Sequence, residues 1–493
     1  MQASTLLVRW AENPSAAAAI TDDRGTHSYE SIARHAYGVA AALGDVRGER
    51  VALLVPPGAA FVASLLGAWL AGACVVVLSP LHPPPETAYF LDDSKATAIV
   101  VSADLRARVE ASGVRLLDPA GCVPASSFDS ALLAPASAAA LQLYTSGTTG
   151  KPKGAVLTHA NLDANTAVLE TAWGMAPSDL LLHVLPLHHT HGLVVALLTT
   201  LRAGAHVHML PAFDARAVWA ALEDATVFMA VPTIYSKLVA AFDKALPDTQ
   251  EKWMYHARTL RLATSGSAAL PVSLGNRWRQ IAGRLPLERY GMTEIGMALS
   301  NPLDHAMRQP GSVGYPLPTV EARVVGGENE GELWVRGPSV FDGYFGKEEA
   351  TRASFAPSDD GGAPWFMTGD TVLRDPSGSF KILGRSSVDI LKSGGYKISA
   401  LEIEEVIREL EGVAEVAVVG VPDEEWGDRI IAVIVAKPGY AGELDTEKLR
   451  EFCKQKLAVY KVPKEAILVA ELPRNAMGKV VKPDLVKLLT KSL

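Results

Sequence analysis

Short, uninterrupted runs of apolar residues alternate with longer amphipathic segments along most of the chain. Each run is bounded by Pro, Gly or Ser and has too few polar positions to leave one face in water. Strands buried on both faces belong in parallel sheets that helices cover. We therefore predict an α/β fold with a helix at 61–71 and strands at 51–55, 75–78, 98–101, 180–185, 227–231 and 260–264.

The most apolar stretch, residues 61–78, is about the minimum length that spans a membrane. It contains two glycines, Gly67 and Gly72, and changes at Cys74 into a run of three valines. This change of pattern predicts a buried helix followed by a buried strand. We therefore expect no association with a membrane.

The pattern changes after about residue 311. Residues 331–335 and 379–383, with glycine-rich segments between them, indicate antiparallel β structure, and residues 356–364 indicate an exposed loop. These segments predict a β-rich subdomain that completes a large N-terminal domain, residues 1–385.

A last unit begins near Asp389. Ser399 and Glu402 have the spacing of a capping box, which predicts a helix that ends near residue 410. The further elements predicted are strands at 413–421, 429–435 and 466–472 and a helix at 446–457. About 100 residues can form a small α+β domain, so we expect a mobile C-terminal domain at 386–493.

Charge and cysteine content exclude several classes of protein. The 46 lysines and arginines against 54 acids give a net charge of −8, whereas nucleic-acid binding needs an excess of positive charge. Cys74, Cys122 and Cys453 are too far apart to indicate a disulfide framework or a CxxC metal site. The N-terminal segment does not resemble a signal peptide, so we expect a cytoplasmic protein.

Residues 144–154, YTSGTTGKPKG, form the strongest local motif, and an apolar strand precedes them. Glycines let backbone N–H groups approach phosphate oxygens, and the hydroxyls and ammonium groups supply further donors. Pro152 follows Lys151, so this segment is not a Walker A loop. The pattern predicts a phosphate-binding loop, with a flexible surface loop as the alternative.

Together with later motifs in a fixed order, this loop resembles the adenylate-forming superfamily of acyl-CoA synthetases, peptide-synthetase adenylation domains and beetle luciferases. The later motifs are YGMTE (290–294), TGD (368–370), GR (384–385) with Asp389, KSGGYK (392–397) and PRNAMGK (473–479). The resemblance implies two steps. A carboxylate attacks the α-phosphate of Mg-ATP to give an acyl-adenylate and diphosphate, and a thiol then displaces AMP.

The resemblance also implies an ATP site. Lys153 and the loop hydroxyls would hold the β- and γ-phosphates, Tyr290 would stack on adenine, and Asp370 would accept the ribose hydroxyl protons. Arg385 would contact the ribose or a phosphate. The full implied set is Thr145, Ser146, Gly147, Thr148, Thr149, Gly150, Lys153, Tyr290, Gly291, Thr293, Asp370 and Arg385.

The implied catalytic residues are Thr293, Glu294 and Lys479. Thr293 would donate to the α-phosphate, and Glu294 with Thr149 would bind Mg²⁺, since hard cations take oxygen ligands. Lys479 would reach the α-phosphate and the attacking carboxylate. An anion that attacks a polyanion needs fixed positive charge where negative charge develops.

In the resembled family the C-terminal domain rotates about a hinge between the two steps. One orientation would bring Lys479 to ATP. The other would bring Gly394 and Gly395 against a tunnel for the pantetheine thiol of coenzyme A, where His189 matches the family's gating position. The hinge residue stays open between Ser387 and Asp389.

Arg289 directly precedes the YGMTE motif, in a stretch that borders the acyl pocket of the family. A guanidinium there would be costly unless an anion paired with it, and its planar fork matches a carboxylate. Arg289 therefore predicts a small dicarboxylic acid as substrate. The alternative is a salt bridge from Arg289 to an internal acid such as Glu288.

Four segments also resemble those of malonyl-CoA synthetases: residues 186–192, 265–271, 288–299 and 387–397. By that likeness, His191 and Ser265 would join Arg289 around the malonyl group. We expect malonate, ATP and CoA as substrates, Mg²⁺ as cofactor, and tolerance of methylmalonate, because one methyl group changes discrimination by only about 1–3 kcal/mol.

Other functions stay open. The same chemistry on another small or aryl acid is one, and an adenylation module that loads a carrier-protein thiol is a second, although nothing after Lys479 resembles a carrier domain. A nucleotide-binding protein without turnover is a third. A zinc site at His188, His189 and His191 is less favoured than ordinary polar histidines. We expect a monomer or weak homodimer that binds small molecules.

Overall fold

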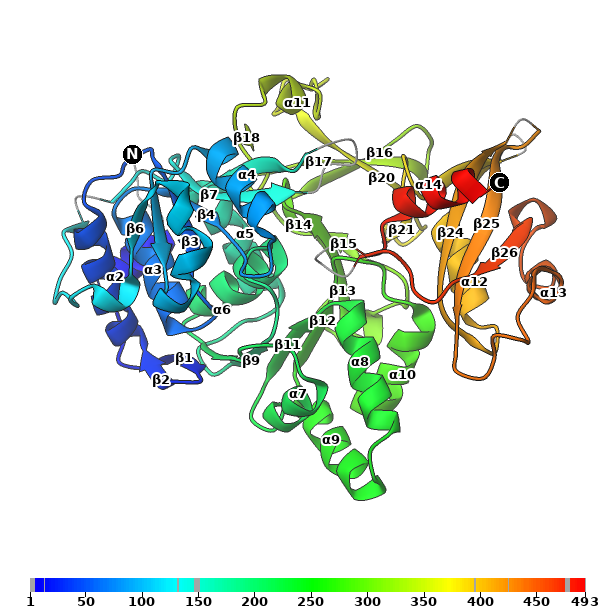
Figure 1. Cartoon of the computed structure of the whole chain (residues 1–493), viewed down its shortest axis with the longest axis horizontal. Coiled ribbons are helices and arrows are strands. Elements are labelled where there is room, and N and C mark those ends of the chain that lie inside the picture. Colours follow the sequence, from blue (N-terminus) through cyan, green and yellow to red (C-terminus); the bar gives the residue numbers. More distant parts are fainter. Residues whose placement is uncertain are drawn as a thin grey trace.

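The computed structural model describes residues 5–12, 14–130, 133–145, 151–393, 396–423, 425–474 and 479–492. Two large sheets form most of the N-terminal body (Figure 1). The seven-stranded sheet has the order β18 (Gly343–Tyr344), β8 (Lys153–Thr158), β7 (Ala139–Thr145), β4 (Cys74–Val77), β3 (Arg50–Leu54), β5 (Ala98–Val101) and β6 (Arg115–Leu117). Its strands β7, β4, β3, β5 and β6 are parallel, and the apolar runs predicted at 51–55, 75–78 and 98–101 are three of them.

The second sheet has nine strands. Their order is β15 (Tyr315–Pro316), β14 (Gly296–Ser300), β13 (Leu287–Met292), β12 (Leu262–Ser265), β11 (Val227–Ala230), β9 (Leu180–His183), β10 (His206–Met209), β1 (Ala18–Asp22) and β2 (Gly25–Ser28). The run from β13 to β1 is parallel, while β14, β15 and β2 add antiparallel edges. The predicted apolar runs therefore fall in the parallel parts of two sheets.

Helices cover both sheets. Those of the body are α1 (Thr5–Glu12), α2 (Tyr29–Leu43), α3 (Ala59–Leu70), α4 (Pro84–Ser94), α5 (His159–Ala172), α6 (Thr199–Arg202), α7 (Ala215–Ala221), α8 (Pro232–Asp243), α9 (Pro247–Thr259), α10 (Val272–Ala282) and α11 (Glu348–Arg352). The segment with membrane-like hydropathy forms the buried helix α3 and then strand β4, as predicted. In the described ranges, every helix is too short or too polar to cross a bilayer.

A smaller antiparallel sheet links the body to the C-terminal domain. It contains β16 (Glu321–Val325), β17 (Glu330–Arg336), β20 (Trp365–Arg374), β19 (Phe355–Ala356) and β21 (Phe380–Arg385). Its antiparallel pairing matches the predicted β-rich subdomain. Strand β21 contacts the first elements of the C-terminal domain, so this sheet carries the connection between the two parts.

The C-terminal domain, hereafter the lid, is drawn orange to red in Figure 1. Its strands are β22 (Ile390–Ser393), β23 (Tyr396–Ser399), β24 (Val413–Asp423), β25 (Gly427–Ala436) and β26 (Glu465–Leu468), and its helices are α12 (Ala400–Arg408), α13 (Thr446–Lys454) and α14 (Lys482–Ser492). Alternate residues of β24 pack on α12 and α13 on one face and on α14 on the other. The lid thus has hydrophobic cores separate from that of the body.

Two local predictions in the lid need correction. Ser399 caps α12, because its Oγ accepts from the backbone N–H of Glu402. The Glu402 carboxylate accepts from Lys461 through both oxygens instead of closing a capping box. Strand β26 ends at Leu468, four residues earlier than predicted. Leu472 is nevertheless buried in the core beside α14, which explains the apolar pattern beyond the strand.

Candidate active site

Arg289 is buried on β13, with a relative exposure of 3%. Its Nε and Nη2 atoms have no hydrogen-bond partner among the described residues. Burial lowers the pKa of the guanidinium to about 9. A buried cation without a partner is unfavourable by itself, so this arrangement is suited to receive an anion.

Glu288 does not pair with Arg289. Successive side chains of a strand point to opposite faces, and the Glu288 carboxylate accepts the backbone N–H of Gly311 at 3.0 Å on its own face. Burial raises the pKa of Glu288 to about 8, and the negative charge of Glu405 adds to this effect. The salt bridge considered as the alternative for Arg289 is therefore wrong for this neighbour.

Glu288 should make the stability of the protein depend on pH. Its pKa is raised from near 4.5 to about 8, so the folded state holds a proton that the unfolded chain releases, and stability falls as pH rises across that range. In Glu288→Gln, which mimics the protonated acid, Tm should match wild type at pH 5 and exceed it by several degrees at pH 9. Thermal unfolding at pH 5, 7 and 9 measures this. A difference that stays constant with pH would contradict the buried, protonated state.

The loop after β12 closes over the guanidinium. A Cβ atom at Gly266 would lie 2.3 Å from Nη1 of Arg289, so any side chain there would displace the guanidinium. Ser267 has a positive φ of 68°, which is uncommon for a residue other than glycine, and its Oγ lies 3.2 Å from Nδ1 of His191. The loop therefore contacts both Arg289 and His191.

Three further polar atoms near this loop are buried without a partner in the described ranges: Nε2 of His191, Nε2 of His189 and Oγ of Ser265. His191 begins a π-helical segment, His191–Leu198, and burial followed by the positive charge of Arg289 lowers its pKa far below the ordinary value. Ser265 ends β12, in register with Glu288. Buried polar groups are normally satisfied, so these atoms mark a place for a polar ligand.

On the other side of β13, Asp370 is buried between two donors. The Tyr290 hydroxyl donates to Oδ2 at 2.5 Å and Arg385 Nε contacts Oδ1 at 3.0 Å. Burial raises the pKa of Asp370, although the charge of Arg385 opposes the shift. The carboxylate keeps lone pairs for further donors, such as ribose hydroxyls. The contact to Asp370 was not foreseen for Tyr290, whose expected role was adenine stacking.

The phosphate-loop motif lies between β7 and β8 in the sequence, and its two described ends pair, with Thr145 opposite Lys153. Ser146, Gly147, Thr148, Thr149 and Gly150 lie outside the described residues. Lys153 Nζ lies 4.4 Å from the centroid of the Tyr344 ring, and the Tyr344 hydroxyl donates to Oε1 of Glu294 at 2.8 Å. Tyr344 thus links the base of the loop to the buried carboxylate of Glu294.

Thr293 and Gly291 belong to the same motif as Glu294. The Thr190 hydroxyl donates to Oγ1 of Thr293 at 3.0 Å. At Gly291, where the register of β13 and β14 shifts, a Cβ would lie 2.1 Å from the carbonyl oxygen of Gly296. Neither Thr190 nor Tyr344 was recognised from the sequence as a site residue. Nothing in their local pattern indicates these contacts.

Lys479 faces this site from the lid. It keeps contact with solvent, yet desolvation lowers the pKa of its ammonium group, the positive charges of Arg385 and Arg289 lower it further, and Asp370 raises it. The same ammonium group lowers the pKa values of His189 and His191. Lys479 is therefore close to both the Asp370 side and the Arg289 side of the site.

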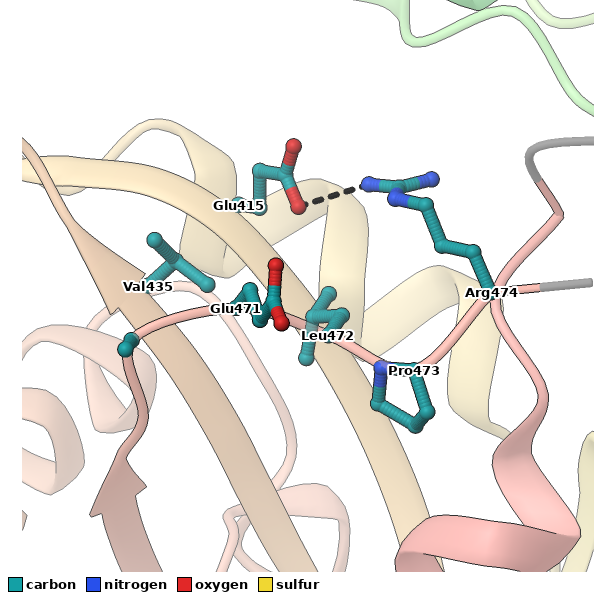
Figure 2. A pocket seen from close by; sticks show the side chains of 7 residues that line it. Glu415, Val435, Glu471, Leu472, Pro473 and Arg474 are labelled. Carbon is teal, nitrogen blue, oxygen red and sulfur yellow. Dashed lines mark hydrogen bonds and ion pairs between the residues drawn. The ribbon is translucent and has the colours of Figure 1, made fainter.

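Residues before and after Lys479 in the sequence bind other parts of the lid. Arg474 pairs with Val480 and binds Glu415 of β24 at 2.6 Å, beside an open pocket of about 440 Å³ that Figure 2 shows. Lys482 is buried and binds Asp389 at 2.5 Å and Glu404 at 2.7 Å. The pocket lies on the lid itself, so it is distinct from the cluster around Arg289 and Asp370.

Two histidines of the segment 186–192, His188 and His189, are packed against each other. The rings of His188 and His189 are 3.9 Å apart, and His82 lies 5.0 Å from His188. Burial lowers the pKa of His188 to about 2 and that of His189 to about 4. Across the residues that the structure describes, no group of three His, Cys, Asp or Glu is placed to hold a metal ion. The geometry thus gives no support to the zinc alternative.

Two family models match the chain. Residues 7–345 match the model described as AMP-binding enzyme, and residues 402–479 match the AMP-binding enzyme C-terminal domain. The chain belongs to the AMP-binding enzyme family. This membership explains why the implied motifs occur in one order, and it agrees with a large body followed by a small second domain.

Named relatives cover nearly the whole chain. The mitochondrial malonate–CoA ligase of Bos taurus is 41% identical over 96% of this chain and 88% of its own length. The malonate–CoA ligase of Arabidopsis thaliana is 39% identical over 90% of this chain and 79% of its own length. The crystal structure of ATP-bound MatB from Rhodopseudomonas palustris has a TM-score of 0.89 at 34% identity and covers both chains completely.

Proposed function

We propose that this protein joins malonate to coenzyme A through an acyl-adenylate, with release of AMP and diphosphate. The observation that carries the choice of acid is the buried guanidinium of Arg289, whose Nε and Nη2 atoms lack partners in the described part of the chain. A distal carboxylate of the substrate would satisfy it with a planar, two-point contact. The named malonate–CoA ligases among the relatives support the same choice.

In the first step we place the reacting carboxylate between the Arg289 pocket and the nucleotide. Asp370 and Tyr290 would hold the ribose side, while Thr293 and Lys479 would face the α-phosphate. Lys479 lies near Arg385 and Arg289, which concentrates positive charge where the attack creates negative charge. Holding the substrate carboxylate beside the α-phosphate in this geometry makes the attack effectively intramolecular, which lowers its barrier.

The carboxylate of Glu294 is suited to bind a magnesium ion. Its carboxylate is buried, one oxygen accepts the Tyr344 hydroxyl, and hard cations prefer carboxylate oxygens. Bound Mg²⁺ neutralises phosphate charge during such a transfer. Glu294 and Thr149 would hold the ion, and Tyr344 orients the Glu294 carboxylate.

The second step needs a thiol to reach the adenylate. We propose that the lid then turns, withdraws Lys479 and opens a tunnel beside His189. The backbone N–H of Ser386 donates to the carbonyl of Gly369 on β20, whereas Asp389 binds Lys482 of the lid, and these contacts support a hinge between Ser387 and Asp389. Asp389 also accepts the backbone N–H of Arg385, a bond that rotation would break. Gly394 and Gly395 lie outside the described residues.

A panel of acids tests this function. Purified protein is incubated with ATP, Mg²⁺ and acetate, propionate, benzoate, succinate, malonate or methylmalonate, with and without CoA. Diphosphate, acyl-adenylate, AMP and thioester products are measured. We expect malonate to give the highest kcat/KM and a CoA thioester. Faster turnover of acetate or benzoate would overturn the choice of acid. Adenylate formation without any CoA thioester would favour a carrier-protein acceptor, and no diphosphate release with any acid would favour a binding protein.

A further inference from the structure

The lid touches the body at a second place, away from Lys479. Glu405 on α12 accepts the backbone N–H of Val272 through Oε1 at 2.7 Å. Val272 is the first residue of α10, and the residue before it, Pro271, supplies no side-chain cap. The first N–H groups of a helix have no partner within the helix and carry partial positive charge, so a carboxylate is favourable there. The lid therefore provides the cap that α10 lacks in its own segment.

This contact lies at the end of the loop that borders the proposed malonate site at Arg289, His191 and Ser265, here called the acid pocket. Residues 266–271 connect β12 to α10, and within them Gly266 packs on the guanidinium of Arg289 while Ser267 contacts His191. Glu288 lies under the same loop and is close enough to Glu405 to feel its charge. The docking point of the lid and the wall of the acid pocket are thus parts of one short segment.

A chain of polar contacts links Glu405 to the segment of Lys479. Arg408 binds Glu405 at 3.2 Å and Glu404 at 3.1 Å. Glu404 in turn binds the buried Lys482 at 2.7 Å. Lys482 begins α14, three residues after Lys479. Displacing Glu405 from α10 would therefore shift the elements that carry Lys479.

We propose that Glu405 is a positioning residue that docks the lid onto the acid-pocket loop and so holds Lys479 where the acyl-adenylate forms. The inference rests on the proposed function, because it assigns the contact to one of its two steps. In the other orientation of the lid, Glu405 leaves Val272, so the thioester-forming step does not depend on the contact.

To test this proposal, adenylate formation and thioester formation are measured separately in Glu405→Ala and in the wild-type protein. Malonate-dependent exchange of labelled diphosphate into ATP reports adenylate formation, and CoA thioester formation from supplied malonyl-adenylate reports the second step. We expect exchange to fall about tenfold, the equivalent of about 1.4 kcal/mol for one charged hydrogen bond, with thioester formation unchanged. Retained thioester formation also shows that the variant is folded. Equal loss in both steps, or loss in neither, would overturn the proposal.

Two further variants sharpen the result. Glu405→Gln keeps an acceptor oxygen but loses the charge that favours the helix end, so exchange should fall by an intermediate factor. Glu409→Ala removes an exposed acid at the end of the same helix, where it pairs with Lys456 inside the lid, and should leave both steps unchanged. A loss in Glu409→Ala as large as in Glu405→Ala would assign the effect to general charge rather than docking.

The outcome also separates this inference from the choice of acid. Wild-type protein that shows no exchange with malonate, but does with another acid of the panel, contradicts the malonate assignment, and the variants are then compared with that acid. Exchange with no acid at all would overturn both the function and the docking role. The two proposals can thus fail independently.

Discussion

Arg289→Ala is expected to lower kcat/KM for malonate by about 10²–10⁴-fold, because the distal carboxylate would enter a buried pocket without its partner. The loss should appear in both kcat and KM, since the guanidinium fixes the position of the acid as well as its affinity. KM for ATP should change little, because Asp370, Tyr290 and Arg385 hold one another on the opposite side of the site. Steady-state kinetics with each substrate varied in turn measures these effects.

Removing the charge of Arg289 should lower activity but raise the stability of the protein. The wild-type protein keeps a buried cation whose Nε and Nη2 atoms have no partner in the part of the chain that the structure describes. Arg289→Met, which fills similar space without charge, should therefore raise Tm while it abolishes preference for malonate. Arg289→Lys keeps the charge but loses the planar fork and should recover only part of the activity. Malonate turnover that survives in Arg289→Met would show that the distal anion is bound elsewhere.

The fold class was predictable because burial on both faces leaves a direct trace in the sequence. Strands β3, β4 and β5 are apolar at nearly every position, and each lies in the parallel part of a sheet. The same burial on both faces hid whether Arg289 pairs with its neighbour Glu288. Glu288 and Arg289 are both buried, so their residue types alone do not show which of the two side chains points into the candidate site. Only the alternation of side chains along strand β13 shows that they point to opposite faces.

The candidate site was predictable where a motif names its own residues and not where a distant side chain supports them. Tyr344 holds Glu294 from 50 positions away, and Thr190 holds Thr293 from 103 positions away. The backbone conformation of Ser267 was also invisible, because a positive φ is fixed by the packing of the whole loop. Residue types and spacing report local chemistry, whereas these contacts depend on how separate sheets and loops meet.

Lys479→Ala is expected to lower malonate-dependent ATP–diphosphate exchange by about 10²–10³-fold, the usual effect of removing one fixed donor from a developing negative charge. Thioester formation from supplied malonyl-adenylate should be nearly unchanged, because we place Lys479 outside the site in that step. In Lys487→Ala, a matched change on an exposed lysine of α14, both steps should match wild type. Each step is measured alone, by label exchange and by CoA thioester appearance.

The pH dependence of exchange gives a second, independent expectation for Lys479. Partial desolvation and the charges of two nearby guanidinium groups lower the pKa of its ammonium group in the protein without substrates. The protonated form is the one that stabilises negative charge, so kcat/KM for exchange should fall as pH rises through that lowered pKa, below the ordinary range of lysine. Binding of ATP and malonate brings negative charge to the same place and should raise the pKa again, which would move the fall in kcat to higher pH. If kcat/KM showed no such fall, or if Lys479→Ala slowed both steps equally, Lys479 would be acting on the fold of the lid rather than on the reacting phosphate.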